Sequence, residues 1–582
     1  MEEDFKKGRV IPYIQSIPDF VSFRVITSII IAIILFLQGF IFRNLLKSAG
    51  KVALTSSDVA FLFTSWQGIL IILNAFVIIV IYMIFEYITL VNITRRLMEG
   101  ERKPVFPSIK ESVVESKRLI DPKAIPIIIF IAVLTPLLGV GISLSITQNF
   151  YIPTFISSVI DSNFVYSILY TVVIVVLSIV ALIFGFTIHG MFLDNLSIPE
   201  ALSQSKRIMK KNWFDYIRKM AFLIMIEVFL IIFLLFVTSI LIVLAKAILE
   251  FDERIMNILM AMFTAGIIGI VTYLVTPFVV MRKTQLYYSY TINDKVLYPV
   301  RKRRHHFLFE ISTVLIVLLT IGAAVICDRF FDELFPKTIS VPIIAHRAGG
   351  VEGNENTLGG LKKAIELNAF GAEIDIQRTK DGYYVLNHDA TFERVAGVDL
   401  MPSEMTLEEV KGIRINNEEV PTIEEILDES HGKLVLFVEL KGDTADKQMC
   451  DDMVKLIKER GIEDEVVLIS LKYDLIDYIE DTYDNIQTAY LTFISFGNIA
   501  ELNCDYVGLE EESATYANIS SIHNNNKKVL VWTVNDIKSQ RHFLLTSADG
   551  IITDYISQAN ETIKELENRS DIERIIDAVL PD

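Results

Sequence analysis

The stretch AEIDIQRTKDGYYVLNHD, residues 372–389, decides the fold of the second half of this 582-residue chain. Glu373 and Asp375 alternate with Ile374 and Ile376, and a period of two is typical of a β-strand. Such a strand turns its two carboxylates to one side and its isoleucines to the other. This arrangement suits the wall of a barrel, with the carboxylates inside.

A turn follows this strand at Lys380-Asp381-Gly382. Its short length favours a hairpin over a helical crossover, so the next apolar run is predicted to be antiparallel. We expect the hairpin to close over Lys380-Asp381 or Asp381-Gly382, which places His388 opposite Glu373 or Asp375.

Similar short apolar runs recur after Pro336 and alternate with polar amphipathic stretches, as in parallel strands joined by helices. The predicted strands are 342–346, 372–378, 383–388, 434–440, 466–471, 488–492, 506–509, 529–533 and 550–553. Nine strands are one too many for an eight-stranded barrel, and the hairpin accounts for the surplus. About 240 residues then suit a TIM barrel, (β/α)8, with an inserted hairpin.

Polar residues stand at the C-terminal ends of these strands, where such barrels hold their active sites. Three carboxylates, two cationic side chains and two histidines are expected to converge there: Glu373, Asp375, Glu439, Arg347, Lys441, His346 and His388. Oxygen ligands without cysteine favour one divalent cation, Mg²⁺ or Ca²⁺. Cations stabilise charge on a phosphoryl group, and histidines exchange protons near neutral pH, so the set fits phosphodiester cleavage.

These residues resemble the successive sequence blocks of the glycerophosphodiester phosphodiesterases. The blocks occur in order over nearly all of residues 341–582: His346-Arg347-Ala348-Gly349-Gly350, Glu355-Asn356-Thr357, Glu373-Ile374-Asp375, Thr379-Lys380-Asp381-Gly382, His388-Asp389, Glu439-Leu440-Lys441, Trp532-Thr533-Val534-Asn535 and Asp549-Gly550-Ile551-Ile552-Thr553-Asp554. Each block is weakly specific alone, and the ordered set is strongly specific.

The resemblance implies a TIM barrel that releases an alcohol and sn-glycerol 3-phosphate from glycerophosphodiesters. It implies metal ligation by Glu373, Asp375 and Glu439. It also implies acid/base roles for His346 and His388, with phosphate contacts from Arg347 and Lys441. Asn354 departs from the family pattern, which has proline before Glu-Asn-Thr, so we expect a looser loop there.

Two further residues have alternative interpretations. Trp532 either packs in the core or lines the pocket for the alcohol. Glu355 either orients Arg347 or approaches the metal. We include Trp532 and Glu355 among the substrate-binding candidates, with Arg347 and Lys441.

The first half has a different composition. Residues 341–582 hold 22 Lys and Arg against 47 Asp and Glu, a net charge of −25, so residues 1–340 carry +8 of the total of −17. The acidic second half excludes a nucleic-acid partner, which requires concentrated basic residues. The chain is 52% hydrophobic with a mean hydropathy of +0.45, which is typical of a membrane protein.

Seven apolar runs are each long enough to cross a hydrocarbon core of about 30 Å, which takes about 20 helical residues. They are Phe23–Phe42, Gly68–Leu90, Ala124–Ile146, Val165–Ile188, Met220–Ala245, Ile255–Val280 and Phe307–Cys327. We therefore predict a polytopic membrane domain, residues 1–335, followed by a catalytic domain, residues 336–582. This half looks like the membrane segment of some bacterial members of the family.

Lys and Arg concentrate in alternate loops, and such loops remain cytoplasmic. The rich loops lie near residues 95–123, 206–219 and 282–304, whereas 148–164 has no Lys or Arg. With seven spans, this pattern places the N-terminus inside and the catalytic domain outside a bacterial cell membrane. Glu86 and Glu227 lie within spans. We expect Glu86 to lie near a membrane interface and Glu227 to snorkel or pair within the bundle, rather than mark a transport path.

Alternatives to a membrane-bound phosphodiesterase remain. One is a receptor or scaffold whose barrel binds glycerophosphate groups without turnover, although a binder has no need of acid/base histidines. Another is a phospholipase D-like hydrolase acting on lipid of the bilayer, or an enzyme forming a cyclic phosphate. The seven helices are expected to anchor the barrel and to contribute a lipid-facing groove or a partner surface.

Overall fold

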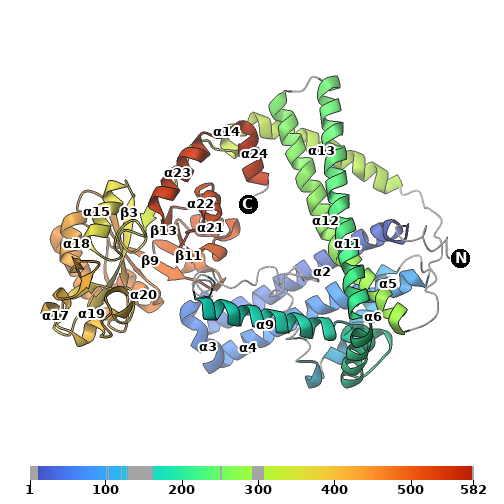
Figure 1. The fold of residues 1–582 in the computed structure, drawn as a ribbon, viewed down its shortest axis with the longest axis horizontal. Helices are drawn as coiled ribbons and strands as arrows, with labels where there is room; N and C mark the ends of the chain where they lie inside the picture. The colour runs from blue at the N-terminus through green and yellow to red at the C-terminus, as the bar shows by residue number, and fades with distance from the viewer. Residues whose placement is uncertain are drawn as a thin grey trace.

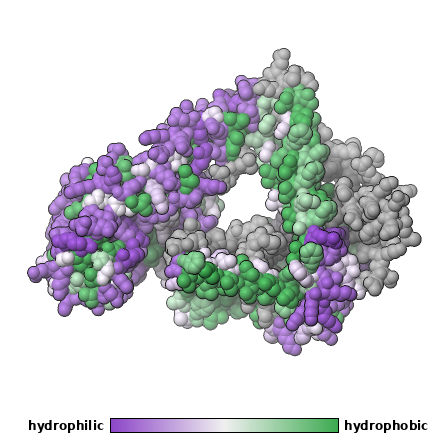
Figure 2. All heavy atoms as spheres, in the orientation of Figure 1, coloured by the Kyte–Doolittle hydropathy of each residue, from purple (hydrophilic) through white to green (hydrophobic). Residues whose placement is uncertain are grey.

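The computed structural model describes residues 11–99, 101, 104–119, 121–125, 128, 157, 160, 163–249, 252–291 and 307–579. A helical N-terminal part precedes an α/β barrel, and the two lie beside each other in Figure 1. Hydrophobic residues cover the long helices in Figure 2, and hydrophilic residues cover most of the barrel. The contrast in composition between the two halves is therefore a contrast between two structural units.

Eight parallel strands form the barrel, and β4 (Tyr384–Leu386) adds a ninth, antiparallel to β3. The parallel strands are β2 (Ile343–Ala345), β3 (Gly371–Arg378), β7 (Val435–Leu440), β8 (Val466–Ser470), β9 (Gln487–Thr492), β11 (Tyr506–Glu510), β12 (Lys528–Trp532) and β13 (Gly550–Thr553). Pairing of β2 with both β13 and β3 closes the barrel. The predicted TIM barrel with an inserted hairpin is confirmed.

Six of the seven connections between consecutive parallel strands carry an α-helix on the outside of the barrel, and a seventh helix follows the last strand. These helices are α15 (Leu358–Glu366), α18 (Ile423–Ser430), α19 (Lys447–Arg460), α20 (Tyr473–Thr482), α21 (Tyr516–His523), α22 (Ile537–Leu544) and α23 (Ile556–Glu567). Between β9 and β11, within the fully described barrel, the chain instead forms β10 (Ser495–Gly497) and the short 3₁₀ turn η7 (Ile499–Glu501).

The hairpin differs from its predicted register by one residue. Ile376 pairs with Leu386, so the loop has three residues, Lys380 to Gly382, and neither two-residue turn forms. Gly382 has φ +90°, the left-handed conformation that three-residue hairpin loops require. His388 lies beyond the last paired residue, so the approach of its side chain to the acidic pair does not depend on strand register.

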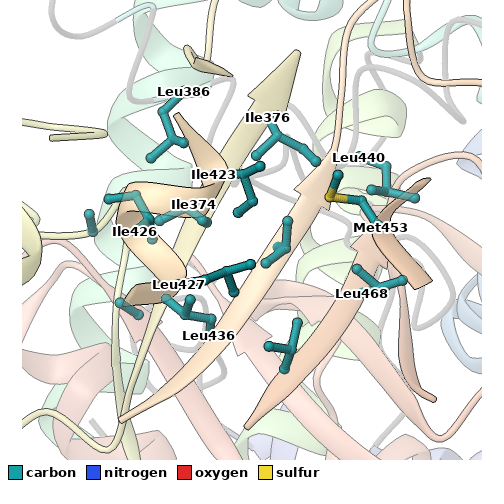
Figure 3. Close-up of a cluster of buried hydrophobic side chains, with 14 of the residues drawn as sticks. Ile374, Ile376, Leu386, Ile423, Ile426, Leu427, Leu436, Leu440, Met453 and Leu468 are labelled. Carbon is teal, nitrogen blue, oxygen red and sulfur yellow. The ribbon is translucent and has the colours of Figure 1, made fainter. Parts of the chain in front are cut away.

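Ile374 and Ile376 face outward from β3 and are fully buried beneath the helices. Figure 3 shows Ile374 beside Ile426 of α18 and Ile376 farther along the same strand, and both belong to one buried cluster with Leu436. The alternation read from the sequence therefore holds. The isoleucines join the strand to its helices, and Glu373 and Asp375 point into the barrel.

Five helical segments in the described part of the chain are long and apolar enough to cross a membrane: Ser16–Ser48, Trp66–Met98, Phe164–Leu193, Ile198–Leu241 and Glu253–Thr291. They contain four of the seven predicted spans and most of a fifth, Met220–Ala245. The predicted span Ala124–Ile146 lies largely outside the described residues, and Phe307–Cys327 lies in the helix α13 (Phe307–Arg329). The count of seven stays a prediction.

The helices that build these segments include a π-helical stretch. They are α2 (Ile11–Ser48), α4 (Trp66–Tyr82), η2 (Met83–Ile88), α5 (Thr89–Met98), α9 (Phe164–Ile183), α10 (Thr187–Leu193), α11 (Ile198–Leu249) and α12 (Glu253–Thr291), with α6 (Val105–Glu115) beside them. Glu86 lies in the π-helical stretch and forms a buried ion pair with Arg24 of α2. Glu86 is thus paired within the helical bundle.

The C-terminal helix α24 (Asp571–Val579) joins the barrel to the membrane helices. Ile575 is buried with residues of α12 and α13, and Arg254 Nε donates to Asp571 Oδ2 at 2.9 Å. The Phe331 ring lies between the guanidinium groups of Arg254 and Arg574, 4.7 and 4.6 Å from its centroid. This contact ties the barrel to the end of α12 that the charge pattern predicts to be extracytoplasmic.

Replacing Ile426 with alanine should destabilise the barrel by about 2–5 kcal/mol, because it leaves a cavity between α18 and β3. The midpoint of barrel unfolding for the full chain in detergent should fall by roughly 10 °C. Leu400→Ala is the matched control, since this side chain is 44% exposed. Equal midpoints for the two variants would show that the helix layer does not support the barrel.

Candidate active site

Glu373, Asp375 and Glu439 form one acidic cluster inside the barrel. Asp375 on β3 pairs in register with Glu439 on β7, so parallel neighbours bring the two carboxylates to the same height. One oxygen from each of the three residues lies within 4.8 Å of the others, and all three are buried. The predicted ligand set is therefore brought together in the structure.

Donors surround the acidic cluster. Lys441 Nζ lies 2.8 Å from Asp375 Oδ1 and 3.1 Å from Glu439 Oε2. The backbone N–H of Arg347 donates to Glu373 Oε2 at 2.8 Å, and the Asn356 amide donates to Asp375 Oδ2 at 2.8 Å. These donors offset only part of the negative charge.

The imbalance shifts the pKa values of the carboxyl groups in opposite directions. Burial, with repulsion from Asp375 and Glu439, raises the pKa of Glu373 well above its ordinary range. Burial raises the pKa of Glu439 to about 7. Burial is the largest single influence at Asp375, but the charges of Lys441, His388 and Arg347, with the hydrogen bond from Lys441, together outweigh it and lower the pKa of this carboxyl group. The site thus needs additional positive charge for all three groups to ionise at neutral pH.

The donor set fits a hard divalent cation. Carboxylate oxygens from three residues converge at one point, and together they form a group that could hold a metal ion. Mg²⁺ and Ca²⁺ both prefer such oxygen ligands. A cation held by Glu373, Asp375 and Glu439 would also relieve the repulsion that raises two of their pKa values.

His346 is held by a carboxylate at the end of the last strand. Its Nδ1 lies 2.7 Å from Asp554 Oδ1, and Asn535 donates to Asp554 Oδ2 at 2.6 Å. A carboxylate accepts, so Nδ1 carries the proton and Nε2 is the free nitrogen. Nε2 lies 4.0 Å from Glu373 Oε2, which places it at the acidic cluster.

His388 is oriented in the same way from another element. Its Nδ1 lies 2.7 Å from Asp389 Oδ1, and Arg394 Nε donates to Asp389 Oδ2 at 2.6 Å. Burial, only partly offset by the charge of Asp375, lowers the pKa of His388. Its imidazole is therefore mainly neutral near pH 7, with Nε2 able to accept a proton.

Glu355 orients Arg347, as one of its two interpretations predicted. Arg347 Nη1 donates to Glu355 Oε2 at 3.3 Å, and Arg394 donates to both oxygens of the same carboxylate. Arg347 Nε is buried and makes no hydrogen bond within the described structure. This donor remains for an anionic group.

Trp532 ends β12 and packs against the cluster of hydrophobic side chains that fills the barrel interior, near Leu530. Leu471, directly after β8, packs against the same cluster. Both residues lie at the C-terminal end of the parallel strands, where the acidic cluster lies. Trp532 is thus placed both to pack and to line the mouth of the barrel.

Several residues of the loop after β2 have positive φ values. Arg347 and Ala348 adopt φ values of 49° and 72°, and Gly350 has φ +59°. A Cβ on Gly350 would lie 2.1 Å from the carbonyl oxygen of Asp554. Glycine at this position therefore lets the loop approach the end of β13, where Asp554 holds His346.

The loop containing Asn354 is not looser, contrary to expectation. The Asn354 amide donates to Glu418, and Asn416 donates to Asn354 Oδ1 at 2.9 Å. These bonds tie the loop to the small β5–β6 hairpin (Arg414–Ile415 and Glu418–Glu419). Side-chain hydrogen bonds here replace the conformational restriction of proline.

Several supporting residues were quoted in the sequence blocks or passed over without a role. They are Asn356, Asp389, Arg394, Asn535 and Asp554. Asp554 follows the last strand directly, so the strand-end rule could have identified it. Arg394 had no signal, because its role depends on a loop folding back over the mouth.

Two family models match the chain. Residues 14–324 match the membrane domain of glycerophosphoryl diester phosphodiesterase, and residues 346–558 match the glycerophosphoryl diester phosphodiesterase family. A glycerophosphodiester phosphodiesterase of Caldanaerobacter subterraneus is 28% identical over 231 residues, covering 36% of this chain and 93% of the relative. One of Bacillus altitudinis is 26% identical over 243 residues, covering 38% and 98%.

Solved structures also match part of the chain. A phosphodiesterase of Oleispira antarctica, in complex with the product sn-glycerol-3-phosphate, is 21% identical with a TM-score of 0.36. The match covers 39% of this chain and 97% of that one.

Without divalent cation, the raised pKa of Glu439 should make the folded chain less stable as pH rises. The folded state keeps a proton up to about pH 7 that the unfolded state loses near 4.5, so stability falls between about pH 5 and 8. Glu439→Gln should be more stable than wild type in EDTA, by a margin that grows with pH, as measured by thermal unfolding. Adding Mg²⁺ or Ca²⁺ should stabilise wild type more than the variant; a margin independent of pH would contradict this assignment.

Proposed function

Because the chain belongs to the glycerophosphoryl diester phosphodiesterase family and carries that family's membrane domain, we propose that it hydrolyses glycerophosphodiesters to an alcohol and sn-glycerol 3-phosphate with a divalent cation and two histidines. The observation that carries the mechanism is that each imidazole is held by a carboxylate of its own, separate from the three of the acidic cluster. His346 pairs with Asp554 and His388 with Asp389. Each imidazole is thereby left with Nε2 free.

The two histidines have complementary roles in this proposal. His388, whose pKa burial lowers, accepts a proton from the attacking water as its oxygen bonds to phosphorus. His346 in its protonated form, stabilised by Asp554, donates a proton to the departing alcohol oxygen as the P–O bond breaks. One water is consumed. The reaction leaves His388 protonated and His346 neutral, and both return to their starting protonation states before the next cycle.

Charge on the phosphoryl oxygens is stabilised from two sides. A divalent cation held by Glu373, Asp375 and Glu439 would supply Lewis acidity to a phosphoryl oxygen. Arg347, held by Glu355, offers its buried Nε as a donor, and Lys441 adds positive charge beside the carboxylates. Trp532 lines the alcohol side of the pocket.

The barrel acts outside the cytoplasmic membrane in this proposal. Residues 1–335, with about seven spans, form the membrane domain, and residues 336–582 form the catalytic domain. The family matches end at 324 and begin at 346, on either side of this boundary. Supporting contacts join the barrel to Ser57, Arg254 and Asp332, all in segments that the charge pattern assigns to the outer side.

Removing the cation, the His388 imidazole or the Glu373 carboxylate should abolish turnover. In full chain with Mg²⁺ or Ca²⁺, His388→Ala and Glu373→Ala should each lower release of sn-glycerol 3-phosphate from glycerophosphocholine by at least about 100-fold, and EDTA should do the same. His431→Ala is the matched control, because this histidine is exposed and directly follows α18, before the start of β7 at the opposite end of the barrel from the site. A folded, cation-binding wild type without turnover on glycerophosphocholine or glycerophosphoglycerol would favour the non-catalytic binder.

Asp554→Asn should lower kcat by at least about 10-fold with little change in KM, because it removes the carboxylate that orients and stabilises protonated His346. Asn535→Ala should act in the same direction but less strongly, since it loosens Asp554 without removing its charge. Steady-state kinetics on glycerophosphocholine measures both. An unchanged kcat in Asp554→Asn would exclude His346 as the proton donor.

A further inference from the structure

A strand of the membrane domain pairs with the catalytic barrel. β1 (Ala53–Thr55), between α2 and α4, runs antiparallel to β10 in a register of Ala53 with Gly497 and Thr55 with Ser495. The Asn498 N–H also donates to Val52 O at 3.4 Å. This pairing occurs at the one barrel connection that has no α-helix.

The pairing lies at the mouth of the barrel. β10 follows the C-terminal end of β9, and the parallel strands place that end at the same side as the acidic cluster. Ser57 Oγ donates to Leu471 O at 2.8 Å, just after β8. Ser56 Oγ lies 3.4 Å from Thr492 Oγ1, at the end of β9. The membrane domain thus contacts the rim of the active site.

The strand has two buried faces that belong to different domains. Ala53 packs into the barrel cluster that contains Tyr490, whereas Leu54 packs with Leu46 and Ile71 of the membrane helices. Gly497 has φ +101°, and a Cβ there would lie 3.1 Å from Val52 O. The close approach of the two strands therefore favours glycine.

The segment that carries β1 lies at the membrane face. α2 ends at Ser48 and α4 begins at Trp66, both ends of candidate spans, and Gln67 Nε2 donates to Ser48 O at 3.4 Å. Trp66 is 60% exposed, and tryptophan is enriched at membrane–water interfaces. Because the spans on both sides end here, β10 and the neighbouring mouth are held at this face.

Exposed apolar side chains continue from the span onto the barrel. Phe63 of α3 (Val59–Thr64) is 71% exposed, and Phe496 of β10, the partner of Leu54, is 56% exposed. Ile494 on the same rim is 40% exposed. These four side chains (the apolar rim: Phe63, Trp66, Ile494 and Phe496) belong to the segments on either side of the β1–β10 pairing, and the chain runs from β1 through α3 directly into the candidate span that begins at Trp66. The surface that fits the apolar rim is therefore the bilayer that this span enters.

We propose that the segment 49–65 holds the mouth of the barrel against the bilayer surface, and that the site acts on glycerophosphodiesters held in that bilayer by an acyl chain in preference to freely dissolved ones. This inference rests on the proposed hydrolysis and adds its substrate class. Phe63 and Phe496 insert among the lipids, so a phosphodiester at headgroup depth lies beside the mouth. The bonds made and broken are unchanged.

The test compares two substrates that differ by one acyl chain. Full-length protein is reconstituted in phosphatidylcholine vesicles, and choline release is measured from lysophosphatidylcholine in the vesicle and from glycerophosphocholine in solution. Phe63→Asp/Phe496→Asp should lower kcat/KM for the vesicle substrate by about 10-fold or more, since burying such a side chain is worth about 1.5–3 kcal/mol. Glycerophosphocholine turnover should change less than about 2-fold. Phe370→Asp is the matched control, because this half-exposed side chain precedes β3 at the opposite end of the barrel.

The pairing of β1 with β10 can be tested separately by a disulfide cross-link. Thr55→Cys/Ser495→Cys should form a disulfide in membranes under mild oxidation, because paired residues of antiparallel strands lie within disulfide range. Each single cysteine variant should not form it. Failure of this cross-link would overturn the placement of the mouth.

The remaining outcomes separate the two proposals. Equal losses on both substrates, no loss on either, or a wild type that prefers glycerophosphocholine would overturn the bilayer preference and leave the hydrolysis intact. A folded wild type inactive on both substrates would overturn the hydrolysis itself.

Discussion

Repulsion among three buried carboxylates is the constraint on which the rest of the site depends. Glu373, Asp375 and Glu439 are drawn together by the register of β3 and β7, and burial prevents water from screening their charges. Lys441, the Arg347 backbone and the Asn356 amide reduce the repulsion without removing it. The same imbalance makes the cluster suited to a divalent cation, whose charge would offset the repulsion.

The histidines reach this cluster by different routes but are organised alike. His346 follows β2 and is held by Asp554 after β13, two strands that close the barrel side by side. His388 follows the hairpin and is held by its sequence neighbour Asp389. Barrel closure therefore fixes one imidazole, and a local loop supported by Arg394 fixes the other.

The membrane domain contacts the barrel directly and does not only connect to it through the chain. Contacts at β1 and at α24 hold the barrel at two places, one at the mouth and one beyond the last barrel helix. Two attachments restrict rotation of a domain far more than one linker does. The orientation of the mouth relative to the membrane helices thus becomes a property of the fold.

The sequence by itself determined the features that depend on neighbours along the chain. Alternation in Glu373 to Ile376 identified β3, the strand ends indicated the three carboxylates that the barrel brings together, and apolar runs identified the long apolar helices, because periodicity and hydropathy are local. Tertiary structure decided the hairpin register, which differs by one residue because Gly382 permits a three-residue loop. It also decided the pairing of Asp554 with His346 and of β1 with β10. These contacts join segments more than two hundred and more than four hundred residues apart, and three-residue strands carry no pattern from which such pairing can be read.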